Sequence, residues 1–142
     1  MILIEDMVNA AAGALVGLDV GPVHAQLPYV QDLSQLVASF QDAVGVRGWV
    51  VSIRRLRWSA DAYGAWLGTA IVLIEGLRAI DMTDGSEPAF RADLERVLTG
   101  LRDSLYGVGT VLVVRRVELV RYDAAREIGN LVCHYAEIEV EA

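Results

Sequence analysis

The sequence places a cysteine directly before a histidine, Cys133 and His134, a pair of residue types that can serve as a nucleophile and its base. Both residues lie in a stretch with the alternating pattern of a β-strand, in which neighbouring side chains point to opposite faces of the sheet. We therefore expect them in the core or at an interface, not in a catalytic dyad. The other histidine, His24, lies between Pro22 and Pro28 and is expected in a loop. Two separate histidines and one cysteine make no zinc ligand set.

Three glutamates alternate near the C-terminus: Glu137, Glu139 and Glu141. In a strand they face the same way, about 6.6 Å apart from one to the next. That spacing is unfavourable for three ligands converging on one metal ion, and nothing in the sequence marks one carboxylate for the raised pKa of a general acid. We expect a solvated strand face, or partners for arginines across the sheet or across a subunit boundary.

A basic and aromatic cluster lies in the middle of the chain. Arginine interleaved with aromatic residues is typical of single-stranded nucleic acid binding and of protein–protein hot spots. The net charge of −7 disfavours nucleic acid. The sequence therefore predicts a subunit or partner contact, with the arginines bound to carboxylates of an adjacent subunit rather than to DNA. For Trp66 the alternative is a position in the core. The cluster consists of Arg54, Arg55, Arg57, Trp58, Tyr63 and Trp66.

The composition predicts self-association. Hydrophobic residues make up 54% of the 142 residues, and the mean hydropathy is +0.40. A membrane-spanning helix needs roughly 18 to 20 consecutive apolar residues. The longest apolar stretches, Ala10–Leu18 and Ala70–Ile74, are much shorter, so we expect no membrane partner. Burial against other subunits explains the excess of apolar residues better than a membrane span does.

Apolar spacing and turn residues predict the elements that position these side chains. Helical spacing predicts three helices, and alternation or β-branched runs predict the strands. In the first long strand the alternation changes phase, which predicts a β-bulge near Arg54–Arg55. The piece Val23–Leu27 between two prolines cannot be a central strand. The helices are Leu3–Leu15, Leu33–Val44 and Phe90–Leu105 with Ser86 as N-cap, and the strands are Trp49–Trp58, Ala65–Ile80, Thr110–Val114, Val117–Tyr122 and Leu131–Val140.

This order of elements predicts one domain, residues 1–142, of the α+β class. Helices come first, then a hairpin from about Trp49 to Ile80, one helix, and further strands. We expect a mostly antiparallel sheet with the helices packed on one face.

The C-terminal half adds a family resemblance. A long strand, Leu67–Ile80, leads through the loop Asp81–Glu87 to the helix Phe90–Leu105. The segment Val117–Tyr122 and the final strand Asn130–Ile138 follow. In this layout the chain resembles the small tail-completion proteins of long-tailed bacteriophages, the tail terminator-like group.

The resemblance implies a structural virion protein that is assembled in the bacterial host cytoplasm and ends up at the tail or neck of the particle. Such proteins form a ring, commonly a hexamer, that caps the tail tube and joins it to the head connector, while DNA passes through without specific binding. The family has no catalytic residues and no cofactor, so the expected protein is not an enzyme. Two alternatives remain: another neck or head–tail connector ring subunit, or a small ligand-binding or enzymatic domain with an unrecognised site.

Overall fold

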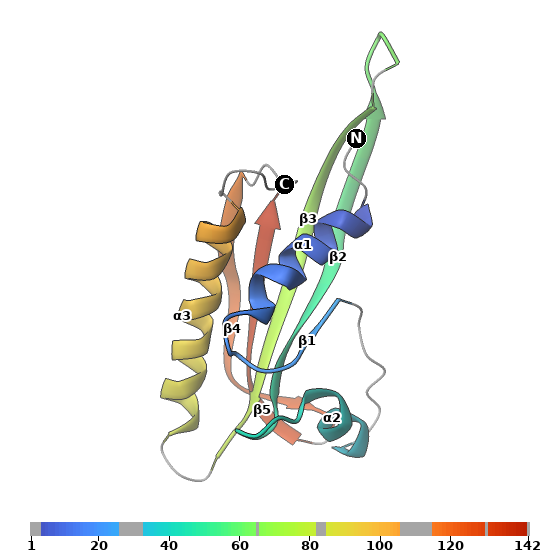
Figure 1. The fold of residues 1–142 in the computed structure, drawn as a ribbon. Coiled ribbons are helices and arrows are strands. Elements are labelled where there is room, and N and C mark those ends of the chain that lie inside the picture. Colours follow the sequence, from blue (N-terminus) through green and yellow to red (C-terminus); the bar gives the residue numbers. More distant parts are fainter. Residues whose placement is uncertain are drawn as a thin grey trace.

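A computed structural model describes residues 4–25, 33–64, 66–81, 85–105, 115–129 and 131–141. This part of the chain contains three helices and five strands. The five strands form a single sheet, and helices pack against it (Figure 1). In chain order the elements are α1 (Ile4–Val16), β1 (Val23–His24), α2 (Leu33–Phe40), β2 (Arg47–Ala60), β3 (Trp66–Ala79), α3 (Ser86–Leu105), β4 (Arg116–Ile128) and β5 (Leu131–Glu141).

The strands lie side by side in the order β1-β2-β3-β5-β4. The two-residue β1 runs parallel to β2, and every other pair is antiparallel. The predicted α+β class with a mostly antiparallel sheet is therefore confirmed. As the prolines indicated, the short β1 lies at an edge of the sheet.

The main core lies between the sheet and the helices α1 and α3, which contact each other on the same face (Figure 1). Trp49 of β2 and Phe90 of α3 are almost fully buried there, and their rings stack with centroids 6.2 Å apart. The indole N–H of Trp49 donates a hydrogen bond to the carbonyl of Val20 at 3.1 Å, which satisfies its one polar atom. The apolar stripe predicted along Phe90–Leu105 is the face of α3 that enters this core.

The opposite face of the sheet carries a second, smaller apolar cluster at one end. Phe40, the last residue of α2, packs there with Val50, Leu77 and Cys133. Val50 belongs to this cluster and its neighbour Val51 to the main core, as strand alternation requires. Helix α2 thus contributes to the reverse face, while α1 and α3 cover the other.

The irregularity predicted in β2 is present. The pairing of β2 with β3 shifts between Ile53 and Arg55, which leaves Arg54 as the extra residue of a β-bulge. The predicted N-cap of α3 was wrong. The carbonyl of Gly85 accepts the N–H of Ala89 at 3.2 Å, so Gly85 precedes the first turn.

Strand β4 is longer than the segment Val117–Tyr122 that alternation predicts. It continues to Ile128 through two irregularities, between Leu119 and Arg121 and between Asp123 and Arg126. Each changes the phase of the alternation, so the second half of the strand has no simple period in sequence. The predicted strand Thr110–Val114 lies outside the described residues.

Candidate assembly surface

The hairpin of β2 and β3 extends well beyond the rest of the sheet as a two-stranded arm (Figure 1). The two strands pair from Arg47 and Arg78 at one end to Ala60 and Trp66 at the other. Strand β5 pairs with β3 only from Ile71 onward. Residues 56–60 and 66–70 therefore have only each other as strand partners among the described residues. An isolated two-stranded hairpin is marginal in water at best, so a long one favours a partner that covers it.

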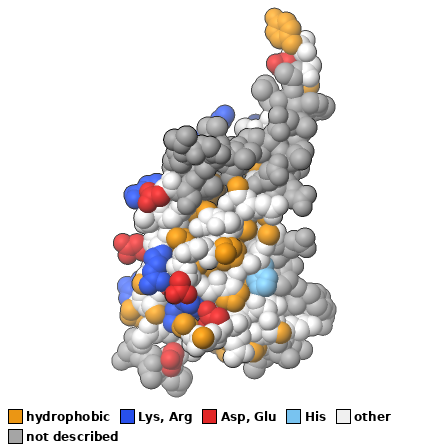
Figure 2. Space-filling model, viewed as in Figure 1, with side chains coloured by type: hydrophobic (Ala, Val, Ile, Leu, Met, Phe, Trp, Pro, Cys, Tyr) orange, Lys and Arg blue, Asp and Glu red, His pale blue; other side chains and the backbone are white. Residues whose placement is uncertain are grey.

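The tip of the arm is a tight turn that presents an aromatic side chain to solvent. The N–H of Tyr63 donates to the carboxylate of Asp61 at 2.8 Å, and the N–H of Gly64 donates to the Asp61 carbonyl at 3.1 Å. Gly64 has a φ of 80°, a conformation that a residue without a side chain adopts readily. The Tyr63 side chain is 98% exposed. Figure 2 shows that the end of the arm stands clear of the body and carries a hydrophobic side chain.

Along the arm, apolar and basic side chains are exposed together. Leu56 is 40% exposed, and Arg55 and Arg57 on either side of it are exposed as well. Trp58 pairs with Gly68 and Trp66 with Ala60 in the backbone register. The side chains of Trp58 and Trp66 lie outside what the structure describes, so their predicted contacts, and the core alternative for Trp66, stay predictions.

Arg54 is bound within its own chain. Its guanidinium donates to Glu139 at 2.8 Å and to Glu137 at 3.1 Å. The hydrogen bond from Arg54 to Glu139 is the main cause that holds the pKa of this arginine above its ordinary value. Since β3 lies between β2 and β5, the Arg54 side chain spans one intervening strand. The predicted Arg–Glu contact exists, but across the sheet, so for Arg54 an adjacent subunit is not the source of these carboxylates.

The three predicted glutamates do share one face of β5, and a second arginine binds that face from the other side. Arg116 of β4 lies 3.2 Å from Glu141 and 3.6 Å from Glu139, and it also pairs with Glu118 on its own strand. The contact of Arg116 could not be predicted from the sequence, because only the register of β4 with β5 brings this residue opposite Glu141.

The bulge gathers the arginines on one face. Regular alternation would place Arg54 and Arg55 on opposite faces, but the extra residue of the bulge keeps them on the same one. Arg55 and Arg57 line a shallow hollow with Ile71 and Glu141, on the same side of the sheet on which Arg54 meets its glutamates. The extra residue reverses the alternation, so the odd positions of β2 beyond the bulge take the face that even positions hold before it. The result is a basic patch, Arg55 and Arg57, beside an acidic strand.

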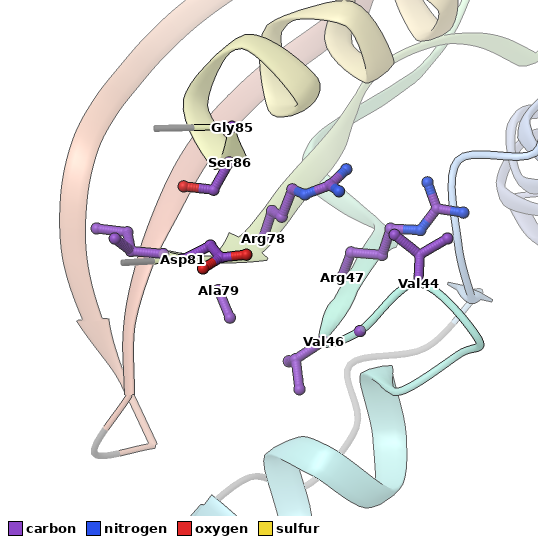
Figure 3. A pocket seen from close by; sticks show the side chains of 10 residues that line it. Val44, Val46, Arg47, Arg78, Ala79, Asp81, Gly85 and Ser86 are labelled. Carbon is purple, nitrogen blue, oxygen red and sulfur yellow. The ribbon is translucent and has the colours of Figure 1, made fainter. Parts of the chain in front are cut away.

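At the far end of the sheet from the arm tip, an open pocket of about 520 Å³ lies between β2, β3 and the start of α3 (Figure 3). Arg47 and Arg78 extend from adjacent strands along one wall, and Ser86 lies on the other. Both arginines bind the buried carboxylate of Asp93 on α3, at 3.3 Å and 3.1 Å. Arg96 approaches the same carboxylate at 3.5 Å. The three arginines are thus already bound to a carboxylate inside the chain.

Arg47 is also bound by Asp42, in the loop before β2. Burial opposes ionisation of Asp42, but hydrogen bonds from Arg47 and from the backbone N–H groups of Val44 and Gly45 outweigh it. Together they hold the pKa of Asp42 below its ordinary value. The carboxylate therefore shapes this loop and anchors Arg47 beside the pocket.

Cys133 and His134 point to opposite faces of β5, as predicted. Cys133 is fully buried in the second apolar cluster, and burial raises the pKa of its thiol to about 11. On the other face, the ring of His134 makes hydrogen bonds with the hydroxyl of Ser86 at 2.9 Å and the carbonyl of Ala124 at 2.6 Å, and it stacks on Phe90. The hydroxyl predicted to cap α3 is thus engaged by a buried histidine. His24, expected in a loop, is in β1 and contacts the Ser39 carbonyl.

The described residues contain no group of three His, Cys, Asp or Glu side chains that could hold a metal ion. Within the same residues, no helix is both long and apolar enough to cross a membrane. No protein-family model matches the sequence, and a search of curated proteins finds no significant match.

Proposed function

We propose that this protein is a structural subunit of a bacteriophage tail, resembling a tail terminator, that assembles into a ring on the end of the tail tube and joins it to the head connector. The layout of the C-terminal half supports the resemblance to tail terminators. The arm of β2 and β3 is the surface that we propose makes the contact. The ring is a hexamer of identical chains in the virion, and the chain acts by contact rather than by catalysis.

The observation that carries the proposal is the two-stranded arm of β2 and β3. It leaves the sheet without further strand partners among the described residues and ends in the exposed Tyr63. Exposed aromatic and arginine side chains are the residue types that dominate binding energy at protein interfaces. An arm of this kind supports a role in reaching a neighbouring subunit or the tail tube.

The charge distribution fits an interface better than a DNA-binding surface. Arg57 of the arm and Arg55 directly before the arm are exposed, and the acidic row Glu137, Glu139 and Glu141 lies on the same face of the sheet. With a net charge of −7 the whole chain repels a polyanion. Such a subunit lets DNA pass through the ring without specific binding.

Electron microscopy of tail tubes incubated with the protein tests this function. We expect rings on tube ends and an arrest of tube elongation. A variant in which residues 57–68 are replaced by a short turn should fold but leave the tube ends bare, whereas Arg102→Gln on the exposed side of α3 should behave like wild type. Tubes that elongate equally with and without the protein would refute the proposal.

A second measurement separates a protein interface from DNA binding. The double variant Arg55→Gln/Arg57→Gln should weaken the ring, and neither it nor the wild type should bind duplex DNA in a gel-shift assay. Salt-sensitive DNA binding that this variant loses while its rings survive would show that the basic patch serves nucleic acid. Rings at the head connector but none on tubes would instead favour another neck subunit.

The pocket of about 520 Å³ beside Arg47, Arg78 and Ser86 is the feature that favours the ligand-binding alternative. Its arginines are held by Asp93, so an anionic ligand would have to compete with a buried carboxylate. A monomer that binds a small molecule at this pocket, and does so less well after Arg78→Gln, would support that alternative.

A further inference from the structure

The sheet has an open edge on each side. Strand β4 pairs with β5 and has no second neighbour among the described residues. On the other side β1 pairs with β2 only at Trp49 and Val50, so β2 is open from Val51 onward in the same part of the chain. Each open edge is a row of backbone donors and acceptors that another strand can use.

Resting on the ring assembly proposed above, we propose that β4 of one copy pairs with β2 of the next copy, so that the sheets of neighbouring subunits form one continuous sheet. The occupant of each edge is a second copy of this chain. The contact joins two different edges and is therefore head-to-tail, the kind of contact that closes a ring.

Strand direction supports this pairing. The four long strands β2, β3, β5 and β4 alternate in direction, because each neighbouring pair is antiparallel. The two open edges therefore run in opposite directions. A copy related by rotation about an axis along the strands brings its β2 alongside β4 in antiparallel orientation. The two strands also match in length, with 14 and 13 residues.

In one register an apolar pair and an oppositely charged pair meet across the two edges. Leu119 of β4 is 39% exposed and pairs with Ile138 on the helix-bearing face; Leu56 of β2 is 40% exposed and pairs with Ala70 on that same face. Placing Leu119 opposite Leu56 of the next copy puts Glu118 opposite Arg57 on the reverse face, where Glu118 also pairs with Arg116 of its own strand. One register thus pairs an apolar contact on one face with a charge contact on the other.

This register also sets a stagger that suits a closed sheet. Within one chain Leu119 is level with Ile138, then Ile74, then Val51. Leu56 lies five residues further along β2, of which one is the extra residue of the bulge. The register is therefore offset by four residues over the four long strands of one copy, about one residue per strand. A closed barrel of eight strands with a shear of eight has the same offset per strand.

Pairing of two β4 edges by a two-fold axis is the competing arrangement. It would give a closed dimer, and it would leave the exposed Arg55 and Arg57 of β2 without the acidic partner that Glu118 provides. Charge complementarity therefore favours β4 with β2.

Cysteine crosslinking in a Cys133→Ala background tests the inference. In one chain Leu56 and Leu119 are three strand spacings apart across the sheet, about 14 Å, and four rows apart along the strands, about 13 Å, so no disulfide can join them internally. We expect the double variant Leu56→Cys/Leu119→Cys to give a ladder of crosslinked oligomers under mild oxidation. The control Leu56→Cys/Val132→Cys moves one cysteine to β5, which has strand partners on both sides, and should crosslink at least tenfold less.

The outcomes separate the inference from the proposed function. Crosslinked dimers from Leu119→Cys alone would mean that two β4 edges pair, and would overturn the head-to-tail contact. A wild-type ring without a ladder from the double variant would overturn the shared sheet while the ring assembly stands. A wild type that never assembles, alone or on tail tubes, would refute the assembly and the inference with it.

Discussion

Replacing Asp93 by asparagine should destabilise the fold more than any surface charge change. The Asp93 side chain is 6% exposed and accepts hydrogen bonds from Arg47 and Arg78, at 3.3 Å and 3.1 Å. Arg47 is itself only 7% exposed. Asp93→Asn keeps the shape and one acceptor oxygen but removes the negative charge that compensates these arginines. Removing one partner of a buried ion pair costs about 3–5 kcal/mol.

The expected loss lies at the lower end of that range, about 3 kcal/mol, because Arg47 retains its bond to Asp42 at 3.0 Å. For a chain of this size such a loss lowers the melting temperature by about 6–12 °C. Urea unfolding followed by circular dichroism measures it directly, with the midpoint shifted and the slope unchanged. Measurements at two protein concentrations separate folding from assembly.

The matched control is Asp103→Asn on the same helix. Asp103 pairs with Arg102 at 3.1 Å, and both side chains are exposed, so the change should cost at most about 0.5 kcal/mol. If Asp93→Asn costs no more than Asp103→Asn, the buried carboxylate does not organise the arginines, and the account of this end of the sheet is wrong.

Three further outcomes are expected. The Cys133 thiol, fully buried with its pKa raised to about 11, should resist alkylation in the native protein and react in urea; rapid native labelling would contradict its burial. Because the pKa of Asp42 is lowered in the folded state, its contribution to stability is present above about pH 4 and is lost as the pH falls through the folded-state pKa. Asp42→Asn should therefore make the free energy of unfolding less dependent on pH on the acid side. An unchanged acid limb would show that other carboxylates set it. Gly76→Ala should destabilise the fold by about 1–3 kcal/mol, because a Cβ there would overlap the buried ring of Trp49, and a neutral effect in urea unfolding would contradict that packing.

Local periodicity was enough to predict most of the fold. The apolar stripe of α3 and the alternation in β5 reflect which side of each element is buried, and that is written residue by residue in the chain. The phase change near Arg54 predicted the bulge for the same reason. What the phase change could not indicate was that the residues beyond it would join Arg54 on one face.

Contacts between distant segments were not predictable from such patterns. Nothing near Asp93 in the sequence marks Arg47 and Arg78, which bind its buried carboxylate from β2 and β3. Arg116 meets Glu141 only through strand pairing. The arm arises because β2 and β3 extend beyond the end of β5, and local patterns in the sequence do not show where one strand ends relative to another. Among the candidate site residues, the cluster from Arg54 to Trp66 was predicted from composition, while the structure shows that its part from Leu56 onward lies on an arm and that Arg54 is bound to β5.

Sedimentation velocity of the purified protein, alone and with tail tube protein, tests the central claim of self-assembly most directly. Six chains of 15.4 kDa give a particle of about 92 kDa. We predict a boundary of that mass, in solution or on the tube, that the arm-truncated variant loses while its circular dichroism spectrum stays folded. A single species of 15.4 kDa under both conditions would contradict the account.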